Sequence, residues 1–198
     1  MDGVAMVMGL DPIAWFHGWM AEAETSELND PNAVALATVS GDGMPNVRMV
    51  LMKRLDARGF AFYTNAESRK GEELRENPRA AMCFHWKSLR RQIRVSGTVE
   101  ELPDSDAEDY FHSRSRLSQL GAMASQQSRP LASREALEVR VKELEEAYPG
   151  EIPRPEYWKG YVLRPERIEF WQEGAGRLHD RFLFLRVEGG WVRERLFP

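Results

Sequence analysis

The chain has 198 residues, 42% of them hydrophobic, and a formal net charge of -4. This length supports one domain with a real core, and the acidic balance disfavours a general nucleic-acid binder, which usually has a basic excess. No Lys or Arg occurs before Arg48, whereas both are frequent from Arg48 to Arg94, and this uneven charge suggests a small anionic ligand rather than a polyanion.

One helix and three strands are predicted in the first third of the chain. Residues 1–10 are expected to form a loose tail, and a helix is predicted to begin at Pro12 with Asp11 as its N-cap. Strands are predicted at 33–40, 46–55 and 59–65. Together they resemble an antiparallel meander, and the second of them would hold Arg48 and Lys53 on opposite faces.

The middle of the chain adds a short helix and two strands. The helix is predicted at 67–78, because Pro78 stops it. Strands follow at 79–86 and 91–102, where apolar residues alternate with polar ones. The only cysteine of the chain, Cys83, lies in the first of these strands and is interpreted as a buried structural thiol in a reducing compartment.

Two helices come next. Ser105 and Glu108 have the spacing of a capping box, so a helix is predicted to start there and to run past residue 118. This helix would carry Tyr110, Arg114 and Ser118 on one face, at i, i+4 and i+8. After a loop, the sequence predicts an amphipathic helix at 134–148.

Strands close the chain. They are predicted at 159–166, 167–172 and 177–187, with a further candidate at 191–197. Within the third, a period of two places Arg177, His179 and Arg181 on one face. Strands and helices do not alternate regularly, so we expect a mainly β (α+β) single domain over residues 1–198: an antiparallel barrel with short helices at its edges. No apolar run approaches the ~20 residues of a membrane span, which favours the cytoplasm.

Several kinds of site are excluded by missing motifs. The chain has no G-x-x-x-x-G-K-[ST] loop, and no G-x-G-x-x-G follows a strand. Its four histidines lack the H-E-x-x-H spacing and have no cysteine partners, so no metal site is expected. A G-x-S-x-G elbow is also absent.

Basic residues remain as the candidates for binding an anion. Ser68, Arg69 and Lys70 fall in the first turn of the helix at 67–78, where backbone N–H groups and the helix dipole favour negative charge. A solvated basic turn is the alternative. The basic segment "KSLRRQIR" could also be a nucleic-acid-binding patch. We do not favour this interpretation, because no aromatic stacking platform accompanies the segment and the whole chain is acidic. The face carrying Tyr110 either holds a phosphate or is simply exposed.

Five collinear motifs resemble the pyridoxine/pyridoxamine 5'-phosphate oxidase family. They are "RMVLMK", "FYTNAESRK", "RQIRVSG", "YFHSRSRLSQLGAMASQQS" and "IEFWQEGAGRLHDRF", and the match covers roughly residues 30 to 198. The last motif is the most specific. The resemblance implies a split antiparallel β-barrel of the FMN-binding type with flanking short helices. It also implies a homodimer with FMN at the subunit interface, without nucleic-acid or membrane partners.

The resemblance also implies the roles of individual residues. The FMN contacts would be Arg48, Met49, Val50, Leu51, Met52, Lys53, Tyr63, Thr64, Arg69, Lys70, Gln92, Gln127, Ser128, Trp171 and Arg181. The substrate contacts would be Lys53, Tyr110, Arg114, Ser118, Arg177, Leu178 and His179. Arg177 and His179 would be the catalytic pair over the substrate ring, and Asp180 would pair with a nearby arginine.

The implied reaction oxidises pyridoxine 5'-phosphate or pyridoxamine 5'-phosphate to pyridoxal 5'-phosphate. A hydride passes from C4' to flavin N5, and O2 reoxidises the flavin with formation of H2O2; the imine formed from the amine hydrolyses to the aldehyde and ammonia. Family members often carry a basic, tyrosine-containing N-terminal extension that helps to cover the substrate. Because the ten residues before the helix contain no Lys, Arg or Tyr, two alternatives stay open: a flavin oxidase acting on another ring, as in phenazine pathways, and a non-catalytic binder of pyridoxal phosphate or flavin.

Overall fold

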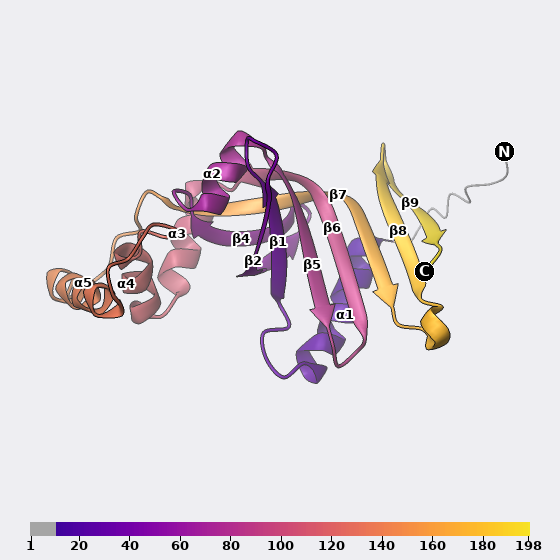
Figure 1. The fold of residues 1–198 in the computed structure, drawn as a ribbon, viewed down its shortest axis with the longest axis horizontal. Coiled ribbons are helices and arrows are strands. Elements are labelled where there is room, and N and C mark those ends of the chain that lie inside the picture. Colours follow the sequence, from indigo (N-terminus) through magenta and orange to yellow (C-terminus); the bar gives the residue numbers. More distant parts are fainter. Residues whose placement is uncertain (1–10) are drawn as a thin grey trace.

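The computed structural model describes residues 11–198, so the predicted tail at 1–10 lies outside the described residues (Figure 1). The helices are α1 (Pro12–Ser26), α2 (Arg69–Glu76), α3 (Asp104–Ser113), α4 (Arg116–Ala124), α5 (Arg134–Ala147) and the 3-10 helix η1 (Ala175–Arg177). The strands are β1 (Ala33–Val39), β2 (Pro45–Leu51), β3 (Arg54–Asp56), β4 (Gly59–Asn65), β5 (Arg79–Trp86), β6 (Arg91–Glu101), β7 (Trp158–Gln172), β8 (Asp180–Val187) and β9 (Gly190–Leu196).

The strands form one antiparallel sheet that curls into a half-barrel. Its order is β2-β1-β5-β6-β7-β4-β3, and β8 and β9 branch from β7. One edge of β7 pairs with β6, while its other edge pairs first with β4 and then with β8. Figure 1 shows the result, with α3, α4 and α5 at one end of the sheet and β8 and β9 at the other. The expected split antiparallel barrel with flanking short helices is confirmed.

The main core lies between α1 and the sheet. The Asp11 carboxylate accepts a hydrogen bond from the backbone N–H of Ile13 at 2.9 Å, so the predicted N-cap of α1 is confirmed. Phe16 of α1 is fully buried and packs edge-on against Phe60 of β4 and Phe84 of β5. Burying such aromatic surface is the dominant stabilising contribution to a fold of this kind.

Two predicted strand boundaries are wrong because the chain changes partner or bulges. The segment 46–55 is two strands, since β2 pairs with β1 whereas β3 pairs with β4. The segments 159–166 and 167–172 form one strand, β7. The register between β6 and β7 shifts at Ser96/Gly97, where the pairing bulges. This irregularity accommodates Pro165, which has no N–H to donate to the neighbouring strand, and β7 continues beyond it.

Gly97 at this bulge is predicted to be intolerant of a side chain. A Cβ there would lie 1.9 Å from the carbonyl oxygen of Arg164, so Gly97→Ala is expected to lower the free energy of unfolding by about 3 kcal/mol in urea titrations. The control is Gly121→Ala in α4, where nothing lies within 4 Å of the new Cβ and the expected change is a gain of about 0.5–1 kcal/mol. Equal urea midpoints for the two variants would contradict this account of the bulge.

The predicted long helix after residue 104 is also wrong. It breaks into α3 and α4 at Arg114, whose backbone is extended, and Ser115 then serves as N-cap of α4 by accepting from the N–H of Ser118. Tyr110, Arg114 and Ser118 therefore do not share one helix face. The capping box does not form either, because the N-cap of α3 is Pro103 and not Ser105.

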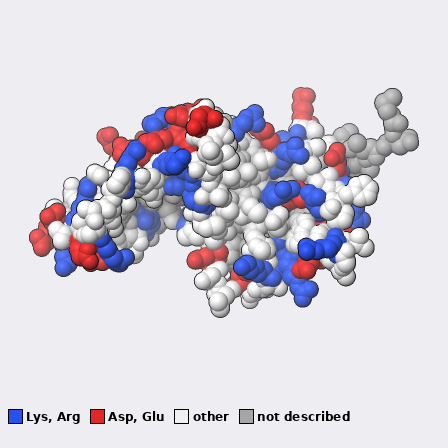
Figure 2. Space-filling model, in the orientation of Figure 1, with Lys and Arg blue, Asp and Glu red and all other residues white. Residues whose placement is uncertain are grey.

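Charges of both signs are interspersed over the face shown in Figure 2. Among residues 11–198, no helix is long and apolar enough to cross a membrane. Nor do these residues contain a group of three or more His, Cys, Asp or Glu side chains placed to hold a metal ion.

Candidate active site

A cavity of about 440 Å³ lies between β2, β4, α2, α3 and the loop before α5. Its walls are Arg48, Met49, Val50, Leu51, Lys53, Tyr63, Thr64, Lys70, Tyr110, Arg114, Gln127 and Trp158. All but the last were predicted as cofactor or substrate contacts. Arg48 and Lys53, expected on opposite faces of one strand, line the same cavity because β2 ends at Leu51 and the chain turns before β3.

Lys70 lies in the first turn of α2 and is 8% exposed. Its ammonium donates hydrogen bonds to Gln127 Oε1 (2.6 Å), Thr64 Oγ1 (3.1 Å) and Ser68 Oγ (3.1 Å). All three acceptors are neutral. Burial, assisted by repulsion from Arg48, lowers the pKa of Lys70 to about 8. A buried ammonium without an anionic partner, next to the N-terminus of a helix, is suited to hold an anion.

Glu73 holds the two neighbouring arginines in place. Its buried carboxylate accepts from Arg48 Nη2 at 3.1 Å and from Arg69 Nε at 3.2 Å. Asn46 and Thr38 donate to the same carboxylate. Burial opposes the charge, but the hydrogen bonds from Thr38, Arg48 and Arg69 outweigh it and keep the pKa of Glu73 below its ordinary value. The guanidinium groups are thus oriented before any ligand arrives.

Glu73→Gln is predicted to weaken the fold at neutral pH and to flatten its acid sensitivity. A lowered folded-state pKa gives stability that is present above the unfolded-state pKa and lost as the pH falls through the folded-state value. We expect a loss of about 3 kcal/mol at pH 7, because one member of a buried ion pair is neutralised, and a smaller loss at pH 4. Urea titrations at both pH values measure this.

A matched control is Glu138→Gln, because Glu138 pairs with Arg134 on the exposed surface of α5. This substitution is expected to change the free energy of unfolding by less than about 0.5 kcal/mol. Parallel pH profiles for the native chain and Glu73→Gln would show that the Glu73 charge does not stabilise the fold.

Aromatic rings line the next part of the cavity. Tyr63 of β4 and Tyr110 of α3 stack with their centroids 4.1 Å apart and their planes at 20°. The ammonium of Lys53 lies 5.9 Å from the centroid of Tyr110. Burial raises the pKa of Tyr63, so its hydroxyl stays protonated and able to donate. This wall therefore combines flat apolar surface with a cation and hydroxyl groups.

Arg114 and Trp158 also line the cavity, and the guanidinium carbon of Arg114 lies 4.4 Å from the centroid of the Trp158 ring. Arg114 Nη1 and Trp158 Nε1 are buried, and neither has a hydrogen-bond acceptor among the residues that the structure describes. Burial lowers the pKa of Arg114. Buried donors without acceptors are costly, and their presence in one wall indicates that the cavity accepts a ligand rich in acceptor atoms.

A second cluster surrounds η1, at the other end of the sheet. Trp171, Arg177 and His179 line a separate cavity of about 530 Å³. The rings of Trp171 and His179 lie 4.6 Å apart. His179 Nδ1 accepts from the backbone N–H of Gly174 at 3.2 Å, so the proton of the neutral imidazole is on Nε2.

The predicted alternation of Arg177, His179 and Arg181 along one strand is wrong. Arg177 has a φ of 67°, and Gly176 before it has a φ of 63°, so the chain forms a left-handed turn here. The strand β8 begins only at Asp180. Arg177 and Leu178 are exposed on this turn, whereas His179 is half-buried beside Trp171.

Arg181 is bound within its own sheet. Its Nε donates to Glu169 at 2.9 Å and its Nη1 donates to the carbonyl oxygen of Phe197 at 2.8 Å. The hydrogen bond to Glu169 raises the pKa of Arg181. Gln92 pairs in register with Trp171 on the same sheet. Asp180 forms an ion pair with Arg195, which confirms its expected pairing with an arginine.

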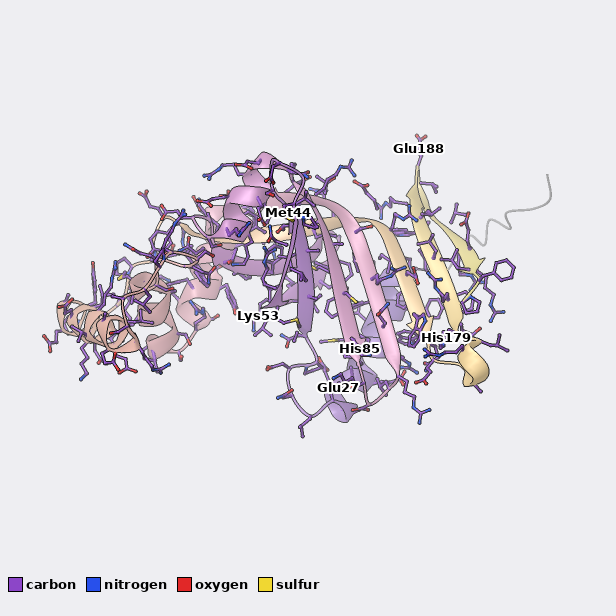
Figure 3. The ribbon with its side chains drawn as sticks, in the orientation of Figure 1. Glu27, Met44, Lys53, His85, His179 and Glu188 are labelled. Carbon is purple, nitrogen blue, oxygen red and sulfur yellow. The ribbon has the colours of Figure 1, made fainter. Side chains whose placement is uncertain are left out.

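One copy of the chain does not bring all the predicted contacts together. Figure 3 shows Lys53 beside the end of β2 and His179 beside η1, separated by the width of the sheet. Outside the main cavity are Met52, Arg69, Gln92, Ser118, Ser128, Trp171, Arg177, Leu178, His179 and Arg181. Of these, Arg69 and Ser128 contact each other beside it, since the Arg69 N–H donates to Ser128 Oγ at 3.2 Å.

Sequence reasoning missed two residues of the main site. Glu73 follows Arg69 by four positions, and this helical ion-pair spacing was an available signal. Trp158 had no comparable signal, because it follows a Pro-rich loop and becomes a cavity wall only where β7 meets α3 in the fold.

The known proteins that resemble this chain agree with one another. The family described as "Pyridoxamine 5'-phosphate oxidase" matches residues 20–148, and "Pyridoxine 5'-phosphate oxidase C-terminal dimerisation region" matches residues 158–198. A protein of Brucella anthropi named pyridoxine/pyridoxamine 5'-phosphate oxidase is 58% identical over 94% of this chain and 94% of its own length. A protein of the same name from Sinorhizobium fredii is 57% identical over 95% of this chain and 93% of its own length.

Solved structures extend the comparison. PhzG from Burkholderia lata 383, in complex with tetrahydrophenazine-1-carboxylic acid, superposes with a TM-score of 0.91 at 33% identity, over 100% of this chain and 98% of PhzG. A pyridoxamine 5'-phosphate oxidase-related, FMN-binding protein of Nostoc punctiforme has a TM-score of 0.79 at 18% identity, over 96% of this chain and 100% of its own, and shows the shared fold. The matched family, its dimerisation region and these relatives together establish that the chain belongs to the pyridoxamine 5'-phosphate oxidase family.

Proposed function

We propose that the protein is an FMN-dependent oxidase that converts pyridoxine 5'-phosphate and pyridoxamine 5'-phosphate to pyridoxal 5'-phosphate. The observation that carries the proposal is the charge of the main cavity, which is lined by Arg48, Lys53, Lys70 and Arg114. Within residues 11–198, only Arg48 among these four has an ion-pair partner. Cations without counter-ions in a half-enclosed, partly aromatic cavity suit ligands that carry phosphate.

The residues around the N-terminus of α2 fit the phosphate end of FMN. Arg48, Arg69 and Lys70 supply charge, and the first two are oriented by Glu73. Gln127 would exchange its bond to Lys70 for one to the cofactor. When bound, FMN supplies a hydride acceptor for C4' of the substrate and, on reoxidation by O2, the route to H2O2.

A second group of lining residues fits the phosphate of the substrate. Lys53 and Arg114 supply charge there, and Tyr110 supplies a hydroxyl group beside them. Ser118 lies in the first turn of α4, where its hydroxyl is within 2.8 Å of Ser115 Oγ. Two anchored phosphates would fix the substrate ring relative to the flavin, and alignment of this kind contributes up to roughly 7–11 kcal/mol to catalysis.

A second copy of the chain would complete the site. Val47, Met49 and Leu51 on the outer face of β2 are 69%, 64% and 38% exposed, and the last two line the cavity. Exposed apolar side chains in a row indicate a surface that another chain covers. We infer a homodimer in which the second copy brings its Arg177 and His179, from the matched dimerisation region, over the substrate ring.

The test is anaerobic reduction of bound FMN. Protein loaded with FMN should lose its flavin absorbance when pyridoxine 5'-phosphate or pyridoxamine 5'-phosphate is added, and pyridoxal 5'-phosphate should form. Admission of O2 should restore the absorbance and release H2O2. Bound flavin that neither substrate reduces would overturn the proposal, and tight binding of pyridoxal 5'-phosphate under those conditions would identify a binder instead of an oxidase.

The similarity to PhzG favours one second candidate, oxidation of a reduced phenazine carboxylate. A carboxylate is also an anion, so the cationic cavity suits it in part. Flavin reduction by tetrahydrophenazine-1-carboxylic acid, without reduction by the B6 phosphates, would establish this candidate. The proposed function requires the reverse preference.

A further inference from the structure

Trp158 lines the main cavity, but it is not among the residues expected to contact FMN or the substrate. It is the first residue of β7 and is 9% exposed. Its indole Nε1 has no acceptor among the described residues 11–198. The guanidinium carbon of Arg114 lies 4.4 Å from its ring centroid. A cation at that distance from an indole face is attracted by the negative charge of the face.

The backbone of Trp158 is hydrogen-bonded through both its N–H and its carbonyl oxygen. Its backbone N–H donates to the carbonyl oxygen of Pro155 at 2.9 Å, and its own carbonyl accepts from Arg154 Nη1 at 2.6 Å. Arg154 also forms ion pairs with Asp104 and Glu108 at the start of α3. The backbone of Trp158 is therefore tied through Arg154 to the same helix that precedes Arg114, and this brings the indole next to the Arg114 guanidinium.

Arg114 has few other restraints. No ion pair involves it within the described part of the chain, and its Nη1 is buried without an acceptor. Its backbone is the C-cap of α3, where the helix breaks before Ser115. A long side chain at a helix break has many rotamers, and the indole face is the contact that selects one of them.

We propose that Trp158 is a positioning residue that fixes Arg114 against the anionic group of the substrate, and so sets the affinity of the enzyme for phosphorylated rings. The inference rests on the proposed function, because it names the wall that recognises the substrate phosphate. The ring acts through Arg114, and the planar guanidinium then offers paired N–H donors to phosphate oxygens.

The experiment compares Trp158→Leu with Trp158→Phe in enzyme loaded with FMN. Loss of the aromatic face in Trp158→Leu should raise KM for pyridoxine 5'-phosphate about tenfold and leave kcat within about twofold. Trp158→Phe keeps a weaker aromatic face and should raise KM about threefold. The inhibition constant of inorganic phosphate, a probe without a ring, should rise by the same factors.

The Trp158 substitutions are also made in the Arg114→Ala variant, because the effects of substitutions at two interacting residues do not add. If Trp158 acts through Arg114, neither Trp158 variant should change KM further once Arg114 is alanine. Trp158→Phe preserves most of the ring volume, so the cycle can be completed even if Trp158→Leu does not fold.

Four outcomes can be told apart. Unchanged KM in both Trp158 variants, or equal effects of Trp158→Phe with and without Arg114, would overturn this inference while the oxidase activity stands. A fall in kcat with KM unchanged would also overturn it. Absence of flavin reduction by B6 phosphates in the unmodified enzyme would instead overturn the proposed function.

Discussion

FMN should bind about 50-fold more weakly to Lys70→Met than to the unmodified protein, because hydrogen bonds to a charged group are worth roughly 1.5–3 kcal/mol. Lys70 is buried in the first turn of α2 and its hydrogen-bond acceptors are all neutral, so its charge is available to a phosphate. Methionine has a similar length and keeps the packing. Quenching of flavin fluorescence during titration of FMN-free protein measures the dissociation constant.

The affinity for FMN should also depend on pH through Lys70. Its pKa of about 8 means that the FMN-free protein loses this positive charge as the pH rises through 8. Above that pH the dissociation constant should rise, by at most about tenfold per pH unit, and Lys70→Met should lack this dependence. The free energy of unfolding of the FMN-free protein should instead increase with pH over this range. Between pH 8 and the ordinary lysine pKa of 10.5, the unfolded chain binds more protons at Lys70 than the folded chain does, so raising the pH favours the folded state.

Two controls sharpen the Lys70 experiment. Riboflavin lacks the phosphate and should bind equally to the unmodified protein and to Lys70→Met. Lys142→Met changes an exposed lysine of α5 and should leave FMN binding as it is. An equal loss of riboflavin and FMN affinity in Lys70→Met would mean that Lys70 supports the cavity and does not bind the phosphate.

Arg177→Ala should lower kcat about 100-fold, the usual cost of removing one charged donor from a reacting centre, while FMN content is retained. Arg177 is exposed on the η1 turn and, within residues 11–198, forms no ion pair, so its removal costs the fold little. In the proposed dimer it lies over the substrate ring of the other copy. Steady-state kinetics and the flavin-to-protein absorbance ratio measure the two quantities.

Arg69→Ala should give the opposite result, with weaker FMN binding and near-normal kcat once FMN is saturating. Arg186→Ala is the matched control for Arg177, because Arg186 is an exposed arginine of β8 whose guanidinium carbon lies 5.1 Å from the Trp191 ring centroid. Its kcat should stay within about twofold of the unmodified value. If Arg177→Ala and Arg69→Ala lost flavin equally, the division of roles between the two ends of the sheet would be wrong.

Local patterns in the sequence determined much of the fold. Asp11 and Pro12 fixed the start of α1, because a capping carboxylate and a preset φ act within a few residues. The strand-to-helix transition before Arg69 and Lys70 located the basic turn of α2. Alternation of apolar and polar residues located most strands, since a period of two needs only one strand to be visible.

The same patterns failed where the backbone departs from its regular course. The alternation from Arg177 to Arg181 had the appearance of a strand, but positive φ angles at Gly176 and Arg177 make a turn. The i, i+4 spacing of Tyr110 and Arg114 suggested a helix continuing to Ser118, but Ser115 caps a new one. Periodicity does not detect such breaks, because the same types of side chain occur in a regular strand or helix and in the turn that interrupts it.

The sequence by itself therefore determined the family, the local elements and most of the cavity lining, since these depend on motifs and on short-range backbone preferences. Only the tertiary structure decided that Arg48 and Lys53 share a cavity, that Glu73 orients the arginines, and that Trp158 lies beneath Arg114. It also decided that His179 lies a sheet's width away from Lys53 in one chain, and that Arg177 lines the same cavity as His179. These relations join residues far apart in sequence, and the energy that selects them comes from burial and pairing across the folded sheet.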